Sequence, residues 1–180
     1  MKDKKILIGV SGGAAIYKTC GLIRLLKRNN AQVRVVMTQS ATELISPSLF
    51  QALSGTSVAT ELFHSEEKGM EHIALSQWAD LFIIVPATAN TISKIALGIA
   101  DNLLTSTVLA FPSSSPLLIA PAMNNHMWEN EATQNNIKII KNRTSYHLVG
   151  PATGLLANGQ KGEGRMAEVE EIFTIAKKLI

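Results

Sequence analysis

Short apolar runs alternate along this chain with longer segments in which apolar residues recur at helical spacing. The runs at 5–10, 32–37, 81–85, 117–120 and 146–149 predict strands. The segments at 14–28, 39–53, 92–99, 101–109, 129–141 and 169–180 predict helices. Pro47 predicts a break or a new start inside the second helical segment. At most a short strand at 57–60 is expected between 54 and 69, and the Gly-rich stretch 150–164 is expected to be a loop.

This alternation of strands and helices predicts an α/β fold. The run Leu81–Val85 has no polar alternation, which is typical of a strand covered on both faces by helices. We therefore expect a Rossmann-like, doubly wound parallel sheet, a flavodoxin-like three-layer sandwich. A chain of 180 residues with 46% hydrophobic content suits one well-buried core, so residues 1–180 are expected to form a single domain.

Composition narrows the classes of partner. The 17 Lys and Arg residues and 14 Asp and Glu residues are scattered, which argues against nucleic-acid binding and favours a small anionic ligand. No apolar stretch has the length of a membrane span, and residues 1–10 do not resemble a signal peptide. The single Cys20 cannot form an internal disulfide and is expected to act as a small hydrophobic residue. These features predict a cytoplasmic protein without membrane partners, and no metal site is expected.

Two loops that follow predicted strands offer groups for an anion. Ser11, Gly12 and Gly13 lie between the first strand and the first helix, where backbone N–H groups can face a phosphate. The triplet lacks the Gly-x-Gly-x-x-Gly spacing of a dinucleotide fold, so a mononucleotide phosphate or ribityl chain suits it better than NAD. An ordinary tight turn explains it equally well. The segment Thr38, Gln39 and Ser40 supplies two hydroxyls after the second strand, with helix capping as the alternative.

The third and fourth long strands are each followed by a segment whose side chains could line a binding pocket. Thr88, Ala89, Asn90 and Thr91 follow Pro86 with small side chains that would let a planar ring lie close to the backbone. The segment 121–128 reads Pro-Ala-Met-Asn-Asn-His-Met-Trp and is placed to line a pocket at the carboxyl edge of the sheet. A helix entry capped by Asn124, with Met127 and Trp128 in the core, explains it equally well.

Three segments together show a family resemblance. Residues 86–91 with 101–105, residues 121–128, and residues 159–166 (Gly-Gln-Lys-Gly-Glu-Gly-Arg-Met) resemble the homo-oligomeric flavin-containing cysteine decarboxylases in both order and spacing. The likeness covers nearly the whole chain and is greatest for the phosphopantothenoylcysteine decarboxylase branch of coenzyme A biosynthesis. Flavin prenyltransferases share the fold but lack the motif at 121–128.

The resemblance implies an FMN cofactor, a small cysteine-containing substrate, and a homotrimer or homododecamer. It places Ser11, Gly12, Gly13, Thr38, Gln39, Ser40, Thr88, Ala89, Asn90, Thr91 and Ala122 at the flavin. It implies that His72 is the active-site histidine, whereas a lone His taken by itself is more often structural. It assigns Asn124 and Met127 to the substrate, with the Asn124 amide on the carboxylate.

The implied reaction is decarboxylation of 4′-phosphopantothenoylcysteine toward 4′-phosphopantetheine. FMN would oxidise the cysteine side chain so that the resulting thioaldehyde accepts the electrons released with CO₂. His72 would assist proton removal or orient the thiol, and Asn124 would hold the carboxylate without adding a cation.

One position departs from the family pattern. Residues 157–159 read Ala-Asn-Gly where the coenzyme A branch carries Ala-Cys-Gly. The family's cysteine donates the proton that allows reduced flavin to return its electrons, and an amide at Asn158 cannot do so at a comparable pKa. The reaction is therefore expected to stall at the ene-thiol. The alternatives are a peptidyl-cysteine oxidative decarboxylase of the lantibiotic type and a non-catalytic flavin-binding regulatory subunit.

Overall fold

A parallel sheet forms the centre of the computed structural model, which describes residues 1–63, 70–155, 159 and 161–180. The strand order within these residues is β3-β2-β1-β4-β5-β6, and every neighbouring pair is parallel. The strands are β1 (Lys5–Val10), β2 (Gln32–Met37), β3 (Val58–Ala59), β4 (Leu81–Ala87), β5 (Leu117–Pro121) and β6 (Tyr146–Leu148). The order reverses between β1 and β4, which is the switch point of a doubly wound fold. The predicted fold class is confirmed.

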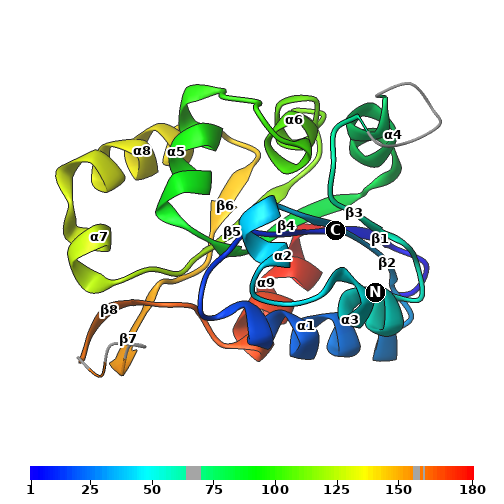
Figure 1. Cartoon of the computed structure of the whole chain (residues 1–180), viewed down its shortest axis with the longest axis horizontal. Helices are drawn as coiled ribbons and strands as arrows, with labels where there is room; N and C mark the ends of the chain where they lie inside the picture. Colours follow the sequence, from blue (N-terminus) through cyan, green and yellow to red (C-terminus); the bar gives the residue numbers. More distant parts are fainter. Residues whose placement is uncertain (64–69, 156–158, 160) are drawn as a thin grey trace.

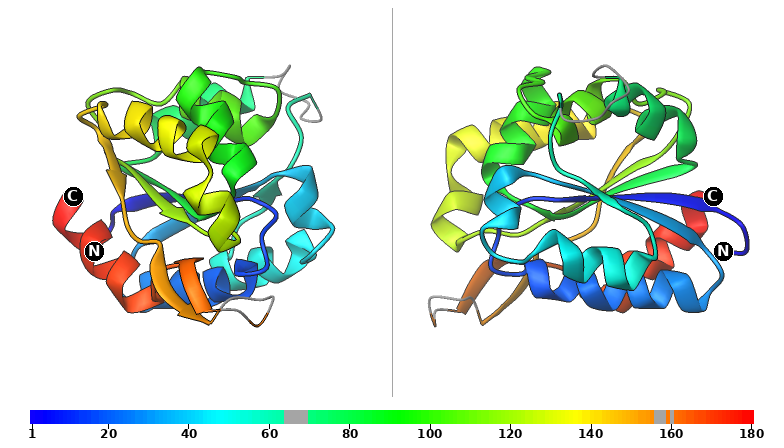
Figure 2. Two further views of the ribbon diagram at one scale, coloured as in Figure 1. Left: turned by 90° about the vertical axis from the view of Figure 1, so that its left-hand side faces the viewer. Right: turned by 45° about the vertical axis from the view of Figure 1, so that its right-hand side comes forward.

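Helices cover both faces of this sheet (Figures 1 and 2). One face carries α1 (Ile16–Arg28), α3 (Pro47–Ser54) and α9 (Val169–Leu179). The other face carries α4 (Glu71–Trp78), α5 (Ala89–Leu97), α6 (Leu103–Leu109) and α8 (Glu131–Lys141). Two shorter helices, α2 (Gln39–Thr42) and α7 (Asn125–Glu129), follow the ends of strands. The result is three layers, as the sequence predicts.

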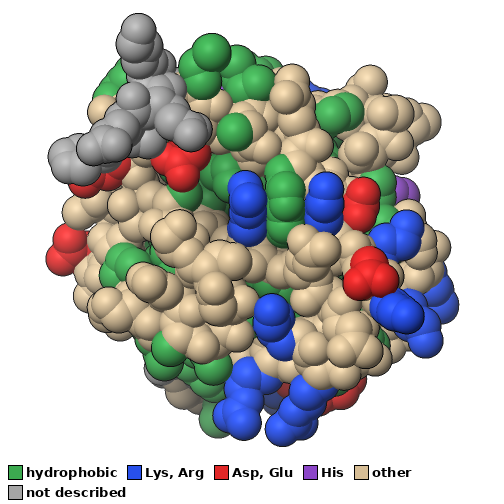
Figure 3. All heavy atoms as spheres, turned by 90° about the vertical axis from the view of Figure 1, so that its right-hand side faces the viewer, with side chains coloured by type: hydrophobic (Ala, Val, Ile, Leu, Met, Phe, Trp, Pro, Cys, Tyr) green, Lys and Arg blue, Asp and Glu red, His purple; other side chains and the backbone are tan. Residues whose placement is uncertain are grey.

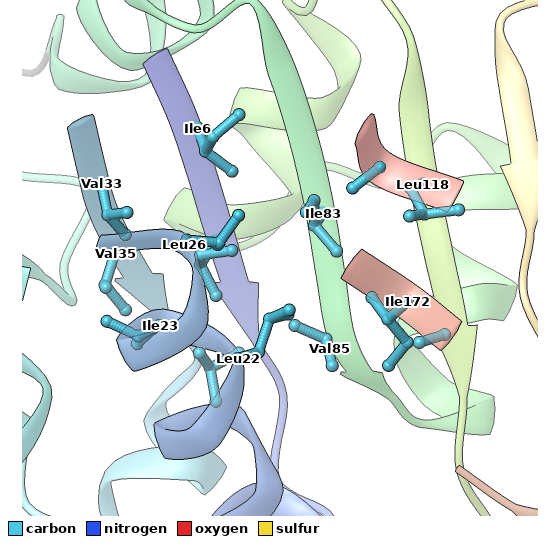
Figure 4. Close-up of a cluster of buried hydrophobic side chains, with 14 of the residues drawn as sticks. Ile6, Leu22, Ile23, Leu26, Val33, Val35, Ile83, Val85, Leu118 and Ile172 are labelled. Atoms are coloured by element: carbon cyan, nitrogen blue, oxygen red, sulfur yellow. The ribbon is translucent and has the colours of Figure 1, made fainter. Parts of the chain in front are cut away.

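Burial on both faces explains why the strand sequences are apolar without alternation. In β1, Ile6 and Ile8 belong to the core beneath α1 and α9, while Leu7 belongs to the core on the opposite face. All three side chains are fully buried. Figure 4 shows the first core, in which Leu22 of α1 and Ile172 of α9 pack against the sheet. A strand between two helical layers needs an apolar side chain at each position, so periodicity of two is absent.

A new helix begins at Pro47, as the sequence predicts. Thr38 caps α2 by accepting a hydrogen bond from the Ala41 N–H (3.3 Å). Ser46 caps α3 in the same way, accepting from the Ser48 N–H, with Pro47 in the first turn. Pro suits this position because the first N–H groups of a helix need no intrahelical partner. The predicted helix over 39–53 is therefore two helices.

The prediction of a loop over residues 150–164 is wrong. Strands β7 (Ala152–Leu155) and β8 (Lys161–Arg165) form an antiparallel hairpin that packs against α7. The Gly-rich sequence gives no strand pattern because these strands have few apolar side chains. Close packing of their backbone on α7 stabilises them instead. This hairpin lies at the same side of the molecule as α7, at the left of Figure 1.

Charged side chains are dispersed over the face on the right-hand side of Figure 1. Figure 3 shows Lys and Arg side chains interspersed there with acidic, polar and apolar ones. A continuous basic patch of the kind that binds nucleic acid is absent from the described part of this face. No helix in the described residues is long and apolar enough to cross a membrane.

Candidate functional site

A cavity of about 550 Å³ opens at the carboxyl ends of β1, β4 and β5. Loops from three strands, the start of α1 and the β7–β8 hairpin surround it. Its lining consists of Gly12, Gly13, Ala14, Ala15, Tyr17, Lys18, Thr88, Ala89, Ala122, Met123, Asn124, Met127, Leu155, Gly164 and Arg165. Parallel strands deliver their following loops to one edge, so the placement agrees with the topological switch point. The three predicted loop segments after β1, β4 and β5 therefore meet at one site.

Close packing between the first two loops shapes the floor of this site. A Cβ atom built on Gly12 would lie 2.7 Å from the carbonyl oxygen of Ser40. Only glycine therefore allows the loop after β1 to pack against the loop after β2. Thr38 and Ser40 also join their hydroxyl groups by a 3.1 Å hydrogen bond. The capping role of Thr38 is real, and this segment lies behind Gly12 rather than on the cavity lining.

Ser11 connects the loops after β1 and β4. Its Oγ donates to the carbonyl of Pro86 (2.7 Å) and accepts from the N–H of Thr88 (3.0 Å). The residue is 1% exposed. Its side chain therefore positions Gly12 and Gly13 relative to Thr88, and these three residues line the cavity.

Two helices begin at the cavity and turn their positive ends toward it. The cavity is lined by the residues that lead into α1, and by Thr88 and Ala89 at the start of α5. Thr88 caps α5, its hydroxyl accepting from the Thr91 N–H (3.3 Å). Thr91 is buried and Asn90 is exposed, and neither lines the cavity. N-terminal helix ends favour an anionic ligand such as a phosphate.

The segment after β5 begins a helix and also lines the cavity, but of the two residues expected in the core only Trp128 packs there. Asn124 caps α7 by accepting a 2.9 Å hydrogen bond from the His126 N–H, and it also lines the cavity. Met127 lines the cavity and is 48% exposed, whereas Trp128 packs partly against the core. The N–H of Ala122 donates to the carbonyl of Ala87 (3.0 Å), which holds this segment beside the loop after β4. The helix entry is thus also a wall of the pocket.

The hairpin contributes a wall that the loop prediction missed. Gly164 has a φ of +143°, and a Cβ atom at this position would clash with the Met123 carbonyl oxygen. The Met123 N–H donates to the Gly164 carbonyl (2.9 Å), so the hairpin backbone is bonded to the segment after β5. This contact brings Leu155 and Arg165 to the cavity. The Gly-rich motif at 159–166 was the available sequence signal for it.

His72 lies away from the cavity in a single chain. It is half-buried on the first turn of α4, and α4 and α7 lie at opposite ends of the molecule in Figure 1. Its Nδ1 atom is buried and has no hydrogen-bond partner among the described residues. Asn158 lies outside the described residues, so its predicted position is untested. The described residues contain no cluster of three metal-ligating side chains.

The surroundings of two carboxylates and of the thiol shift their pKa values. The hydrogen bond from Lys18 holds the pKa of Glu168 below its usual value, and the bond from Lys94 (2.6 Å) does the same for Asp101. Burial raises the pKa of the Cys20 thiol. Cys20 packs against the core, which agrees with its prediction as a small hydrophobic residue rather than a nucleophile.

The sheet is doubly wound, and its cavity lies at the switch point, beside two helix N-termini that suit a phosphate. These features are typical of α/β proteins that bind a nucleotide or a cofactor. The chain belongs to the family described as Flavoprotein, which it matches over residues 1–180. It is 44% identical over 179 residues to the coenzyme A biosynthesis bifunctional protein CoaBC of Bacillus subtilis (strain 168) and 43% identical over 175 residues to that of Haemophilus influenzae. These matches cover 99% and 97% of this chain, but 43% of each relative, so the chain spans less than half of their length.

Solved structures of decarboxylases are similar to this chain over nearly its whole length. A cysteine-to-serine mutant of PPC decarboxylase complexed with pantothenoylaminoethenethiol is 30% identical, with a TM-score of 0.86 and 98% of both chains covered. The FMN-dependent cysteine decarboxylase SpaF is 32% identical, with a TM-score of 0.81, covering 96% of this chain and 97% of that one. The peptidyl-cysteine decarboxylase EpiD is 26% identical, with a TM-score of 0.81, covering 97% and 99%. The resemblance inferred from the motifs is confirmed at the level of the family.

Proposed function

We propose that the cavity binds FMN and that the chain decarboxylates 4′-phosphopantothenoylcysteine. The observation that carries this proposal is the meeting of Gly12, Thr88 and Asn124 at one cavity, on three different loops. The membership of the flavoprotein family supports it, as do the names of the relatives. The proposed substrate is the one that the PPC decarboxylase relative is named for.

The residues present fit the proposed cofactor. The positive ends of α1 and α5 face the cavity and suit a phosphate, and Gly12 and Gly13 line the cavity without a side chain. Small side chains at Ala89 and Ala122 leave room for a flat ring. FMN, when bound, supplies a two-electron oxidant for the cysteine side chain. Mass spectrometry of the cofactor released from the purified protein should identify FMN; FAD, NAD or an absence of flavin after reconstitution would contradict the assignment.

Asn124 and Met127 are proposed to hold the substrate. The Oδ1 atom of Asn124 caps α7, which fixes the side chain at the cavity and leaves Nδ2 as the donor group of the amide. An amide donor can bind the substrate carboxylate without the ground-state stabilisation that a full positive charge would add. Met127 offers an apolar, adaptable contact beside it.

A second copy of the chain is proposed to complete the site. His72, the proposed catalytic histidine, is remote from Asn124 within one chain (Figure 1). Three large apolar residues are exposed near α5 and α6: Leu97 (62%), Ile99 (45%) and Leu109 (59%). They lie on the same helical layer as α4, which packs against α6. An interface through this surface supports a homotrimer or a homododecamer built from trimers.

Light scattering on the FMN-loaded protein tests this assembly. A mass of three chains or of a multiple of three is expected. A stable monomer that retains FMN would contradict both the assembly and the role proposed for His72.

Asn158 is proposed to stop the reaction after decarboxylation. An amide cannot donate the proton that the second half-reaction needs, so the protein should release CO₂ and hold or release an ene-thiol. The PPC decarboxylase relative solved with pantothenoylaminoethenethiol carries a cysteine-to-serine substitution, which supports the idea that a protein of this fold with one cysteine replaced accommodates an ene-thiol.

Anaerobic mixing with 4′-phosphopantothenoylcysteine tests the function. We expect the flavin absorbance to bleach, one CO₂ per active site to be released, and the organic product to have the mass of the ene-thiol. The Asn158→Cys variant should return the flavin to its oxidised state and yield 4′-phosphopantetheine. Full turnover by the protein with Asn158 would show that another group donates the proton. No bleaching in either protein would contradict the proposed substrate.

A peptide ending in cysteine is the second candidate substrate. The similarity to SpaF and EpiD favours it, because EpiD is named as a peptidyl-cysteine decarboxylase. Bleaching by Cys-terminal peptides, with none by 4′-phosphopantothenoylcysteine, would select this function. Flavin binding without bleaching by either substrate would instead support a regulatory subunit.

A further inference from the structure

Lys18 and Arg165 are the only charged residues among the described residues that line the cavity. They come from α1 and from the last residue of β8, so chain folding rather than sequence proximity brings them together. The Lys18 side chain is 14% exposed and that of Arg165 is 40% exposed. Two cations at the rim of a pocket with an otherwise neutral lining indicate recognition of an anion.

Glu168 binds both cations at once. Lys18 Nζ donates to Glu168 Oε2 at 3.2 Å, and Arg165 Nη2 donates to Glu168 Oε1. Glu168 is also the N-cap residue of α9, yet its side chain makes no capping hydrogen bond. The carboxylate therefore orients the two cations instead of serving the helix. With two positive charges and one negative charge, the cluster retains a net positive charge for a ligand.

Gly154 provides the space that the Arg165 side chain occupies. A Cβ atom at position 154 would lie 3.0 Å from Arg165 Cδ and 3.1 Å from Nη1. The guanidinium is thus held between Gly154 on one side and Glu168 on the other. A planar group fixed in this way loses less conformational freedom when it binds an oxyanion than a freely mobile side chain would.

Arg165 lies beside the segment that is proposed to hold the substrate. The neighbouring Gly164 is bonded to Met123, one residue before Asn124, and the hairpin packs on α7. The anion-compatible backbone at Gly12 and Gly13 lies on the opposite loop, after β1. A cofactor phosphate at the glycine loop therefore leaves Arg165 for a second anionic group, and Lys18 of α1 is tied to Arg165 through Glu168.

We propose that Arg165, positioned by Glu168 and assisted by Lys18, binds the phosphate monoester of the substrate and selects phosphorylated over unphosphorylated substrate. This assignment rests on the proposed function for the identity of the substrate. The chemistry it requires is a phosphate monoester dianion, for which a guanidinium with two parallel N–H groups is well suited. Glu168 acts here as a positioning residue.

Titration calorimetry with 4′-phosphopantothenate and with pantothenate tests the proposal without any chemical step. The FMN-loaded protein should bind the phosphorylated ligand about 10- to 100-fold more tightly, the range typical of hydrogen bonds to charged groups. Arg165→Met should reduce this preference by about tenfold or more, and Arg165→Lys should restore part of it. Glu168→Gln should reduce the preference less than Arg165→Met does, while the affinity for pantothenate stays unchanged.

Lys27→Met is the control, because Lys27 is an exposed cation of α1 that lines neither this cavity nor the neighbouring one that Lys18 and Glu168 also line. It should keep the full preference for the phosphorylated ligand. Equal binding of both ligands by the unaltered protein, or an unchanged preference in Arg165→Met, would overturn the proposal. Weaker retention of FMN but not riboflavin by Arg165→Met would also overturn it, because the guanidinium would then serve the cofactor phosphate.

Calorimetry and flavin bleaching together distinguish a failure of this proposal from a failure of the proposed reaction. A phosphate preference that depends on Arg165 in a protein that does not bleach with 4′-phosphopantothenoylcysteine would support the anion site and contradict the decarboxylation. Bleaching by phosphorylated and unphosphorylated substrate with the same dependence on substrate concentration would support the decarboxylation and contradict the role of Arg165.

Discussion

Ser11 and Pro86 are joined by a buried hydrogen bond of 2.7 Å from the Ser11 Oγ to the Pro86 carbonyl. The same oxygen accepts from the N–H of Thr88 at 3.0 Å. One side chain thus fixes the relative positions of the loops after β1 and β4. These loops carry the glycine backbone and the start of α5 at the cavity, so the site depends on a residue that does not line it.

Ser11→Ala should weaken both folding and flavin binding. The variant leaves the Thr88 N–H without its partner, which costs about 1–3 kcal/mol, and the Pro86 carbonyl keeps only the 3.3 Å bond from the backbone N–H of residue 11. Urea unfolding of the flavin-free protein and titration with FMN measure the two effects. Ser113→Ala, in an exposed loop, is the control and should change neither. Unchanged stability of Ser11→Ala would show that the loops are held by their remaining contacts.

Gly12→Ala and Gly13→Ala should behave differently although the residues are adjacent. The new methyl group at position 12 would lie 2.7 Å from the Ser40 carbonyl oxygen, whereas at position 13 the nearest atom is Thr88 Cγ2 at 3.4 Å. Overpacking against backbone costs about 1–3 kcal/mol, and an ordinary contact costs little. Thermal unfolding of both flavin-free variants checks this difference. Equal losses of stability would mean that the loop after β2 moves to accept the methyl group.

The amino-acid sequence predicts the sheet well because each central strand is covered on both faces. The strand over Leu81–Ala87 is buried at every position, and such continuous burial leaves an unambiguous apolar run. The three loops at the cavity follow from the same reasoning, since the ends of parallel strands share one edge. Pro47 marked the start of α3 because its effect on a helix is local.

The features that the sequence does not predict depend on contacts between distant residues. Strands β7 and β8 have few apolar residues, and their position is fixed by Gly162 and Gly164 against the α7 segment. Helix α4 buries only Leu75 and Ser76, so it has no apolar stripe to reveal it. Lys18 and Glu168 are 150 positions apart, and no local pattern connects them. Motif resemblance identified His72, but only the fold shows its separation from Asn124.

The contribution of Glu168 to stability should disappear in acid. Lys18 holds the folded-state pKa of Glu168 below its usual value near 4.5. A lowered folded-state pKa adds stability above the unfolded-state pKa, and this contribution is lost as the pH falls through the folded-state pKa. The melting temperatures of the unaltered protein and Glu168→Gln should therefore differ near pH 7 and converge as the pH falls below the usual pKa of a glutamate and through the lowered folded-state pKa.

Salt should reduce the same difference, because the Glu168 side chain is half exposed and its ion pairs are screened. Glu171→Gln removes an equal charge from the first turn of the same helix and serves as the control. A difference between Glu168→Gln and the unaltered protein that persists unchanged in acid would assign the effect to packing rather than charge.

Complementation between two inactive variants should reveal a site shared by two chains. His72→Asn removes the proposed catalytic imidazole, and Asn124→Asp places a negative charge against the substrate carboxylate while its own carboxylate can still cap α7 through the His126 N–H. Each variant alone should fail to bleach its flavin with 4′-phosphopantothenoylcysteine. Co-expressed with different tags in equal amounts, they should form mixed assemblies. Since the two residues come from different chains, both are unaltered in about a third of the sites of a mixed trimer and in about a quarter of those of a mixed dodecamer. Anaerobic bleaching of that fraction in the doubly tagged assembly is the expected result, and no bleaching at all would place His72 and Asn124 of each site on the same chain.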